Sequence, residues 1–405
     1  MMGVAVRIFG KRTQAPRNGK GQGPQDAWSA LRERIGARPT GVLTFPTRRS
    51  RLADLLPGEK LLLIRKYGGL GDILICSMLF PDLQDQYPDI HVTFAPPQKY
   101  HPLFEGSGLT LQPYESVFQH LGQDARRGIA RSEFLSGYDL IEDLSMPCHL
   151  WENFFVAHGG TEGGRGLRWR NRLDMWSRWF GLRVANPRTC IVLRAEEKAE
   201  ARRHLRTLCG AGRPVCLLAP FAANRTKSYP WFEDLARGLE ADGWAVVLLH
   251  SKPVPGPTPA ISGPPLRMMG AFCAVADLIV SVDTAAFHWG GILGRPTLGI
   301  YNVNDGAAYR TYYPTARIVQ TCATPCLNTR YGTGNGTCSQ HTSEALPIIP
   351  GLSLSRCYPK ASVEQILEAV RGYAEPRPDH RRTGRAAPAG RETAAPAAAA
   401  PRLWA

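Results

Sequence analysis

Short apolar runs alternate along the chain with glycine turns and segments of helical periodicity. In the first half, the runs that predict buried strands are 61–65, 91–95 and 138–141, with helices expected at 72–86 and within 151–181. In the second half, strands are expected at 215–219, 245–250, 278–280 and 297–301, with helices at 196–208, 231–239 and 363–370. Strands that alternate with helices predict two α/β halves.

These patterns divide the 405 residues into four parts. We expect a basic, partly disordered extension at 1–57, two α/β domains at 58–187 and 188–373, and a disordered Ala/Pro/Arg tail at 374–405. No apolar run approaches the roughly 20 residues that span a bilayer. Nor does the N-terminus read as a secretory signal, so a cytoplasmic protein is expected.

The net charge of +15 comes largely from the two ends of the chain. A basic extension can contact nucleic acid, an anionic membrane or an acidic partner, or it can simply be solvated. No nucleic-acid motif accompanies it, so nucleic acid is not the expected partner.

The most informative segment is 277–301. An apolar strand leads into Ser281-Val-Asp283-Thr284, a small-residue helix then carries His288 one turn in, and Gly294-Arg-Pro precedes a second strand. Polar groups therefore gather at the carboxyl end of a strand and the amino end of a helix, a position that favours phosphate. The alternative is a buried βα turn with a capping Thr and a His at the core edge.

A glycine turn follows the first predicted strand. Gly68, Gly69 and Gly71 permit a tight turn and close ligand approach, and Asp72 comes directly after them. The spacing does not fit the dinucleotide fingerprint Gly-x-Gly-x-x-Gly. Asp72 is a candidate catalytic carboxylate or, alternatively, a structural N-cap.

A third segment, 218–232, runs from a strand through a polar loop to a helix. Its Lys227 lies at the loop-to-helix entrance, where an ammonium group can neutralise a departing diphosphate without a metal. The alternative is an exposed surface lysine.

The three segments, in this order, resemble the family 9 glycosyltransferases, the heptosyltransferases. The family pattern Val-Ser-x-Asp-Thr-Gly-x-x-His, continued to Pro-Thr, is matched at Asp283, Thr284, His288, Pro296 and Thr297, with Ala285 in place of the usual Gly. The early Leu-Gly-Asp, which ends at Asp72, resembles the family's element whose aspartate is the proposed general base. Lys227 and Pro230 match the pattern Lys-x-Trp-Pro, with Tyr229 in place of Trp.

This resemblance implies an α/β, GT-B-like fold, in which two doubly wound Rossmann-like domains face each other across a cleft. It also implies an inverting transfer of a sugar, heptose from ADP-heptose, to a hydroxyl of a glycan or protein, with no cofactor or metal in the chemistry. Asp72 would be the base. The donor-binding residues would be Lys227, Asp283, Thr284, Ala285 and His288.

The chain departs from the family pattern at two places. Ala222 and Ala223 stand where related enzymes often have Thr hydroxyls, and the proline-rich 252–265 lacks an acidic residue that could hold the nucleoside. A transferase for another nucleotide sugar and a non-catalytic nucleotide-sugar-binding protein therefore remain alternatives. The acceptor could enter past four tryptophans, which could equally be packing residues: Trp151, Trp169, Trp176 and Trp179.

Ten cysteines are present, and six of them are scattered as expected for small core residues. The other four, Cys322, Cys326, Cys338 and Cys357, cluster in a segment rich in Thr, Gly, Asn and Ser. Four thiolates could bind structural zinc or iron tetrahedrally, or the cysteines could be unpaired. Their layout resembles the iron finger of the bacterial autotransporter heptosyltransferases, enzymes that glycosylate proteins and form large rings, so a homo-oligomer is also open.

Overall fold

The fold was analysed in a computed structural model. It describes residues 51–65, 68–119, 133–145, 148, 171–184, 187–223, 225–302, 304–321, 346–349, 352–354 and 359–373. The four clustered cysteines, Trp151, Trp169, the extension before 51 and the tail after 373 lie outside these residues. In the described part of the chain, no helix combines the length and the apolar content needed to cross a membrane.

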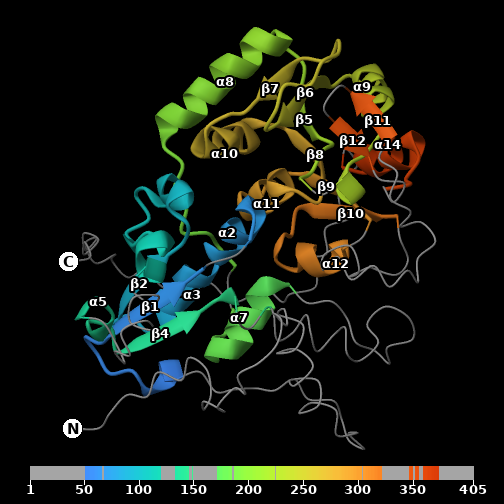
Figure 1. The fold of residues 1–405 in the computed structure, drawn as a ribbon. Coiled ribbons are helices and arrows are strands. Elements are labelled where there is room, and N and C mark those ends of the chain that lie inside the picture. The colour runs from blue at the N-terminus through green and yellow to red at the C-terminus, as the bar shows by residue number, and fades with distance from the viewer. Residues whose placement is uncertain are drawn as a thin grey trace, which may run out of the picture.

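The N-terminal lobe is built on a four-stranded parallel sheet (Figure 1). Its strands are β1 (Lys60–Ile64), β2 (His91–Ala95), β3 (Thr110–Leu111) and β4 (Leu140–Asp143), in the order β3-β2-β1-β4. The helical elements are η1 (Arg51–Asp54), α2 (Leu70–Cys76), α3 (Leu79–Gln86), η2 (Gln98–Phe104), α5 (Glu133–Ser136) and α7 (Arg172–Phe180). A central parallel strand is covered on both faces and therefore needs a continuous apolar run. Strand β1 meets this need, since it is buried from Leu61 to Ile64.

The prediction of one helix over 72–86 was wrong, because the chain breaks between α2 and α3. Pro81 has no N–H to donate to the carbonyl of Ser77, which accepts instead from the backbone N–H of Cys190 at 3.0 Å. The Ser77 hydroxyl also donates to the carbonyl of Leu74 at 2.6 Å, a local bond that competes with helical continuation.

The C-terminal lobe contains a six-stranded parallel sheet. Its strands are β5 (Val215–Ala219), β6 (Ala245–His250), β7 (Ala260–Ser262), β8 (Leu278–Val282), β9 (Thr297–Tyr301) and β10 (Ala316–Gln320), in the order β10-β9-β8-β5-β6-β7. This is the Rossmann strand order, in which the direction of winding reverses between the first and fourth strands, here β5 and β8. A separate antiparallel pair joins β11 (Leu346–Ile349) to β12 (Leu352–Leu354).

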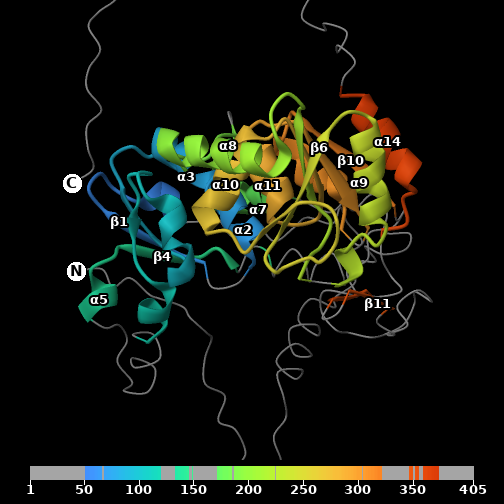
Figure 2. The same cartoon turned by 90° about the horizontal axis from the view of Figure 1, so that it is seen from above.

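Helices cover both faces of this second sheet. They are α8 (Ala195–Cys209), α9 (Phe232–Ala241), α10 (Leu266–Val275), α11 (Ala285–Ile292), α12 (Gly306–Tyr309) and α14 (Val363–Arg371), with the short turns η3 (Arg225–Lys227) and η4 (Arg310–Tyr312). Figure 2 shows α9 and α14 side by side at the outer edge of the lobe. Ser362 and Gln365 form a capping box at the start of α14.

Strands β2, β5, β6 and β9 match their predicted bounds, whereas β7, β10 and α10 were not predicted. The missed strand β7 lies inside the proline-rich 252–265, at the sheet edge, where short strands next to proline are tolerated.

The two lobes share one hydrophobic cluster, which runs from β1 through α2 to α10 and α11. Helix α2 packs against α11 at the centre of the molecule (Figure 1). A second cluster, under α9 and α14, fills the other face of the C-terminal sheet.

Arg267 on α10 connects three parts of the chain away from this centre. Its guanidinium is paired with the carboxylate of Glu197, with Nε to Oε1 at 2.6 Å and Nη2 to Oε2 at 2.8 Å. Nη1 donates to the carbonyls of Pro102 and Leu103 in η2, and Nη2 donates to the carbonyl of Val192. A buried cation thus joins the second lobe to the first and to the segment between them.

We expect Glu197→Gln to lower the free energy of unfolding by about 3–5 kcal/mol at neutral pH, because Arg267 would be left buried without its counter-charge. The hydrogen bonds from Arg267 hold the pKa of Glu197 at about 2, below the ordinary 4.5. A lowered pKa stabilises the fold above pH 4.5, and that contribution is lost as the pH falls towards 2. Urea unfolding at pH 7 and pH 3 measures both effects.

Glu196→Gln is the matched control. Glu196 is exposed in the same first turn of α8, and its loss should cost no more than about 1 kcal/mol. Equal destabilisation by the two substitutions would contradict the role given to the buried pair.

Candidate functional site

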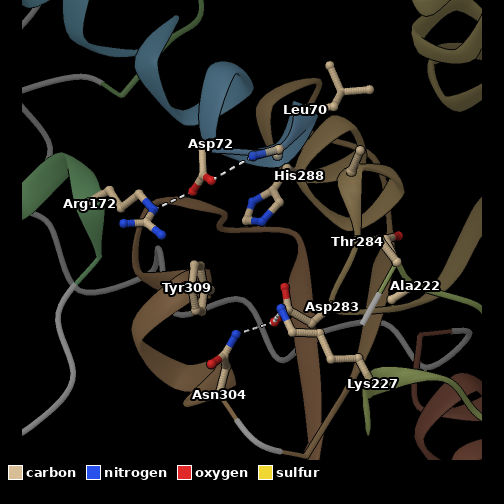
Figure 3. A pocket seen from close by; sticks show the side chains of 14 residues that line it. Leu70, Asp72, Arg172, Ala222, Lys227, Asp283, Thr284, His288, Asn304 and Tyr309 are labelled. Atoms are coloured by element: carbon tan, nitrogen blue, oxygen red, sulfur yellow. Dashed lines mark hydrogen bonds and ion pairs between the residues drawn. The ribbon is translucent and has the colours of Figure 1, made fainter. Parts of the chain in front are cut away.

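A pocket of about 320 Å³ lies between the lobes, within the size range of small-molecule sites (Figure 3). Its N-terminal-lobe lining consists of Gly69, Leu70, Gly71, Asp72 and Arg172. Its C-terminal-lobe lining consists of Ala222, Ala223, Lys227, Asp283, Thr284, Ala285, His288, Asn304 and Tyr309. All the predicted catalytic and donor-binding residues therefore meet in one pocket, together with two of the three predicted glycines.

The strand order of each sheet explains this meeting. The glycine turn follows β1, and Asp283 follows β8, so both lie beyond the carboxyl ends of parallel strands where the winding of the sheet reverses. Open α/β sheets bind ligands at such points. Contact between α2 and α11 brings the two points together.

The glycine turn shapes the backbone around Asp72. Gly68 has a φ of +122°, and a Cβ there would collide with the Asp72 carboxylate, so glycine is required on both counts. Gly69 is the N-cap of α2, and its N–H donates to Oδ2 of Asp72 at 3.0 Å. Asp72 is thus the third residue of the helix, and it caps the helix from within rather than from the N-cap position.

Two arginines face the Asp72 carboxylate. Arg172 Nε donates to Oδ1, and Nη2 of Arg65 lies 4.0 Å from Oδ2. Burial alone would raise the pKa of Asp72, but the positive charges of Arg172 and then Arg65 outweigh it and hold that pKa below its ordinary value. Asp72 is therefore ionised at neutral pH.

On the other side of the pocket, Asp283 is paired with Lys227, with Nζ 2.7 Å from Oδ2. The amide of Asn304 donates to the same oxygen. Burial again raises the pKa of Asp283, but Lys227, with His288 and Asn304, more than offsets this and holds the pKa below its ordinary value, so the carboxylate is ionised. Lys227 is only 23% exposed and is not the free surface lysine of the alternative interpretation.

Thr284 occupies the N-cap position of α11 with an extended backbone, but its side chain does not cap the helix. Its hydroxyl lies 3.0 Å from the hydroxyl of Ser281 instead. The interpretation of Thr284 as a capping residue is therefore wrong, and the amino end of α11 is directed to the pocket at Thr284 and Ala285.

His288 lies between the two carboxylates (Figure 3). It is 4% exposed, and its Nδ1 lies 3.0 Å from the hydroxyl of Tyr313. Burial lowers the pKa of His288 to about 4, although Asp283 and Asp72 act in the opposite direction. The imidazole is therefore neutral at pH 7. When Tyr313 is the donor in the bond to Nδ1, Nε2 carries the proton.

Four residues of the site were missed by the sequence analysis: Arg65, Arg172, Asn304 and Tyr309. Asn304 and Tyr309 follow β9 at the same sheet edge as Asp283, and the N-cap signal of Asp305 could have drawn attention to them. Arg172 lies in a predicted region with several arginines, and nothing local distinguishes it from the others.

Other candidates lie apart from the pocket. Trp176 and Trp179 are packed into the core, where their indole N–H groups donate to the Leu144 carbonyl and to the Glu142 carboxylate. They do not line the pocket as an acceptor path. Among the described residues, no three His, Cys, Asp or Glu side chains are grouped so as to hold a metal ion. The four clustered cysteines fall outside that part of the chain.

Solved structures share this architecture. A family 9 glycosyltransferase from Veillonella parvula DSM 2008 superposes with a TM-score of 0.51 at 15% identity, over 78% of this chain and 97% of the other. The dodecameric, iron-containing heptosyltransferase TibC of enterotoxigenic E. coli, solved with ADP-D-β-D-heptose, gives 0.52 at 12% identity, over 79% and 77%. No family model and no curated protein sequence matches the chain.

These similarities show the fold. The predicted class, two Rossmann-like domains that face each other across a cleft in the GT-B arrangement, is confirmed. The resemblance to the family 9 glycosyltransferases is confirmed at the level of architecture.

We expect Gly71→Ala to destabilise the fold by about 1–3 kcal/mol through overpacking. An added Cβ would lie 2.6 Å from Cδ2 and 3.1 Å from Nε2 of His288, a buried side chain that also contacts Tyr313. Urea unfolding measures the loss. Gly69→Ala is the control, since its Cβ would meet nothing within 4 Å and the change should cost less than about 1 kcal/mol.

The same substitution in a His288→Ala background tests the contact directly. The penalty of Gly71→Ala should then largely disappear, because the atoms that it displaces are absent. An unchanged penalty in that background would show that the two residues do not limit the approach of the lobes.

Proposed function

We propose that this protein is an inverting glycosyltransferase, which moves a sugar from a nucleotide diphosphate sugar to a hydroxyl group. One observation supports the proposal above the others. The pocket between the lobes joins a buried, ionised carboxylate from the first lobe to a lysine, an aspartate and a helix amino end from the second.

In the proposed reaction Asp72 accepts the proton of the acceptor hydroxyl. The hydroxyl oxygen forms the new bond to the anomeric carbon from the face opposite the leaving group, and the electron pair of the breaking bond leaves with the diphosphate. A lowered pKa keeps Asp72 ionised, although it also makes Asp72 a weak base. A weak base suffices because positive charge develops on the sugar as the diphosphate departs.

The departing diphosphate needs positive charge, which we assign to Lys227 and to the amino end of α11 at Thr284 and Ala285. Lys227 holds one of its three N–H donors towards Asp283, which leaves the others for phosphate oxygens. We propose that this chemistry proceeds without a metal ion.

Asp283 suits sugar hydroxyls better than phosphate, because like charges repel. Asn304 orients its carboxylate. Neutral His288, between the two lobes, is suited to donate from Nε2 to an oxygen of the donor.

Heptose from ADP-heptose is the donor that we favour, in line with the sugar nucleotide named in the TibC complex. Ala222 and Ala223 offer no hydroxyls to a donor, so contacts at this edge of the pocket rely on the backbone. A glycan or a protein hydroxyl is the proposed acceptor. A structural zinc or iron on Cys322, Cys326, Cys338 and Cys357, a homo-oligomer and a cytoplasmic location remain predictions of the sequence.

We expect Asp72→Asn to reduce sugar transfer by about 10²–10⁴-fold while donor affinity changes little, since the amide cannot accept the proton. Donor affinity is measured by thermal shift across a panel of nucleotide sugars, and transfer by release of the nucleoside diphosphate in the presence of acceptor. Unchanged turnover would remove Asp72 as the base. Binding of ADP-heptose by the unaltered protein without any transfer would favour a non-catalytic nucleotide-sugar-binding protein. Transfer from a different donor would favour a transferase for another nucleotide sugar.

Lys227→Met should weaken donor binding and lower the rate of transfer, because the diphosphate loses its nearest cation; a loss of about 10²–10³-fold in the rate is expected. Lys99→Met, an exposed lysine of η2 outside the pocket, is the control for the loss of one positive charge. Equal effects of the two variants would contradict a specific role for Lys227.

A further inference from the structure

The first turn of α7 carries three polar side chains that contact three different parts of the molecule. The helix itself is anchored to the N-terminal lobe, where Trp176 Nε1 donates to the Leu144 carbonyl at 2.8 Å and Trp179 Nε1 to Glu142 Oε2 at 3.1 Å. Helix α7 is therefore expected to move together with the first lobe.

Asn171, the N-cap of α7, joins this turn to the second lobe. Its Oδ1 accepts from the N–H of Leu173 at 2.9 Å, and its Nδ2 donates to the carbonyls of Ala308 and Tyr309 at 3.3 and 3.1 Å. Those carbonyls end α12, only a few residues after Asn304. Because Asn171 is 1% exposed, these bonds form without competition from water.

Asp174 makes a second connection between the lobes. Its Oδ1 accepts from the hydroxyl of Tyr312 in η4. Hydrogen bonding to an ionised acceptor is stronger than that between neutral groups. The turn is thus held to α12 and η4 at two points, one on each side of Arg172.

Arg172 lies between these two contacts and is directed to the pocket (Figure 3). Its Nε donates to Oδ1 of Asp72, while the N–H of Gly69 donates to Oδ2. Two donors from separate elements therefore fix the plane of the carboxylate. The Arg172 side chain is 4% exposed, so solvent screens the pair little.

We propose that Arg172 is the positioning residue of Asp72, and that the bonds of Asn171 and Asp174 to the second lobe couple this positioning to the approach of the two lobes. The inference rests on the proposed role of Asp72 as the base. It adds that Arg172 holds the base ionised and oriented, and that the helix of Arg172, α7, is hydrogen-bonded to the donor-binding lobe.

The groups that face Asp72 come from four elements. Arg65 follows β1, Arg172 belongs to α7, His288 belongs to α11, and the neutral, buried thiol of Cys76 shares α2 with Asp72. Without Arg172, the effect of burial would be opposed mainly by Arg65 and His288, and the pKa of Asp72 would rise. The acid limb of the pH profile of transfer would move to higher pH in the same direction, since a protonated Asp72 cannot act as a base.

The test measures the pKa of Asp72 directly, by NMR titration of ¹³C-labelled carboxyl groups in the full chain, with Asp72→Asn to assign the signal. Arg172→Gln should raise this pKa by about 1–3 units, and Arg172→Lys should restore most of the shift, since it keeps the charge. Arg183→Gln removes an exposed arginine beyond the end of α7 and should leave the pKa unchanged. An Asp72 pKa in Arg172→Gln equal to that of the unaltered protein would overturn the positioning role.

Tyr312→Phe tests the coupling between the lobes. It removes the hydroxyl that binds Asp174 from the C-terminal lobe and leaves every group in contact with Asp72 in place. A rise in the pKa of Asp72 smaller than that of Arg172→Gln is expected. No change in Tyr312→Phe would overturn the coupling.

These readouts need no turnover, so they separate this inference from the proposed function. If the pKa of Asp72 shifts in Arg172→Gln but Asp72→Asn leaves transfer unaffected, Asp72 is not the base, although Arg172 still controls its ionisation. The reverse result, loss of transfer in Asp72→Asn without any pKa shift in Arg172→Gln, would sink the inference alone.

Discussion

The approach of α2 to α11 is the contact on which the candidate site depends. Each helix begins just beyond the end of a central strand, and each brings its own polar turn to the meeting point. The approach is close because Gly71 has no side chain where it faces the ring of His288. Since packed interiors have little spare volume, one additional carbon atom there competes directly with the imidazole. Gly71 and His288 thus limit how closely α2 can approach α11.

Each carboxylate of the site is paired with a cation of its own lobe. Asp72 is neutralised by Arg172, and Asp283 by Lys227. Neutral His288 separates the two pairs, so that two buried carboxylates can lie in one pocket without strong repulsion. Arg65 adds one further positive charge behind Asp72. With Arg65 counted beside the residues that line the pocket, three cations surround two carboxylates, and this excess of positive charge suits an anionic ligand.

The sequence predicted the two parallel sheets because buried parallel strands are apolar throughout, as in β5 and β6. It also predicted the residues of the pocket that follow strands directly, such as Asp283. Arg172 could not be predicted, since its pairing with Asp72 joins residues 100 positions apart and depends on how α7 packs. The break before α3 has a local signal in Pro81, but the partner of the Ser77 carbonyl that Pro81 leaves free, the N–H of the distant Cys190, could not be predicted. Contacts of this kind are set by tertiary packing and leave no periodic signal.

Among the described residues of the first lobe, Arg267 binds main-chain carbonyl oxygens, those of Pro102, Leu103 and Glu105. Every amino acid supplies such an oxygen. The contact therefore depends on the course of the neighbouring backbone and not on which side chains it carries. Substitutions along 102–105 that preserve the turn should therefore leave the hydrogen bonds of the guanidinium unchanged. A chimera that combined this C-terminal lobe with the N-terminal lobe of a distant relative would need a backbone of the same course at the junction, whatever its local sequence.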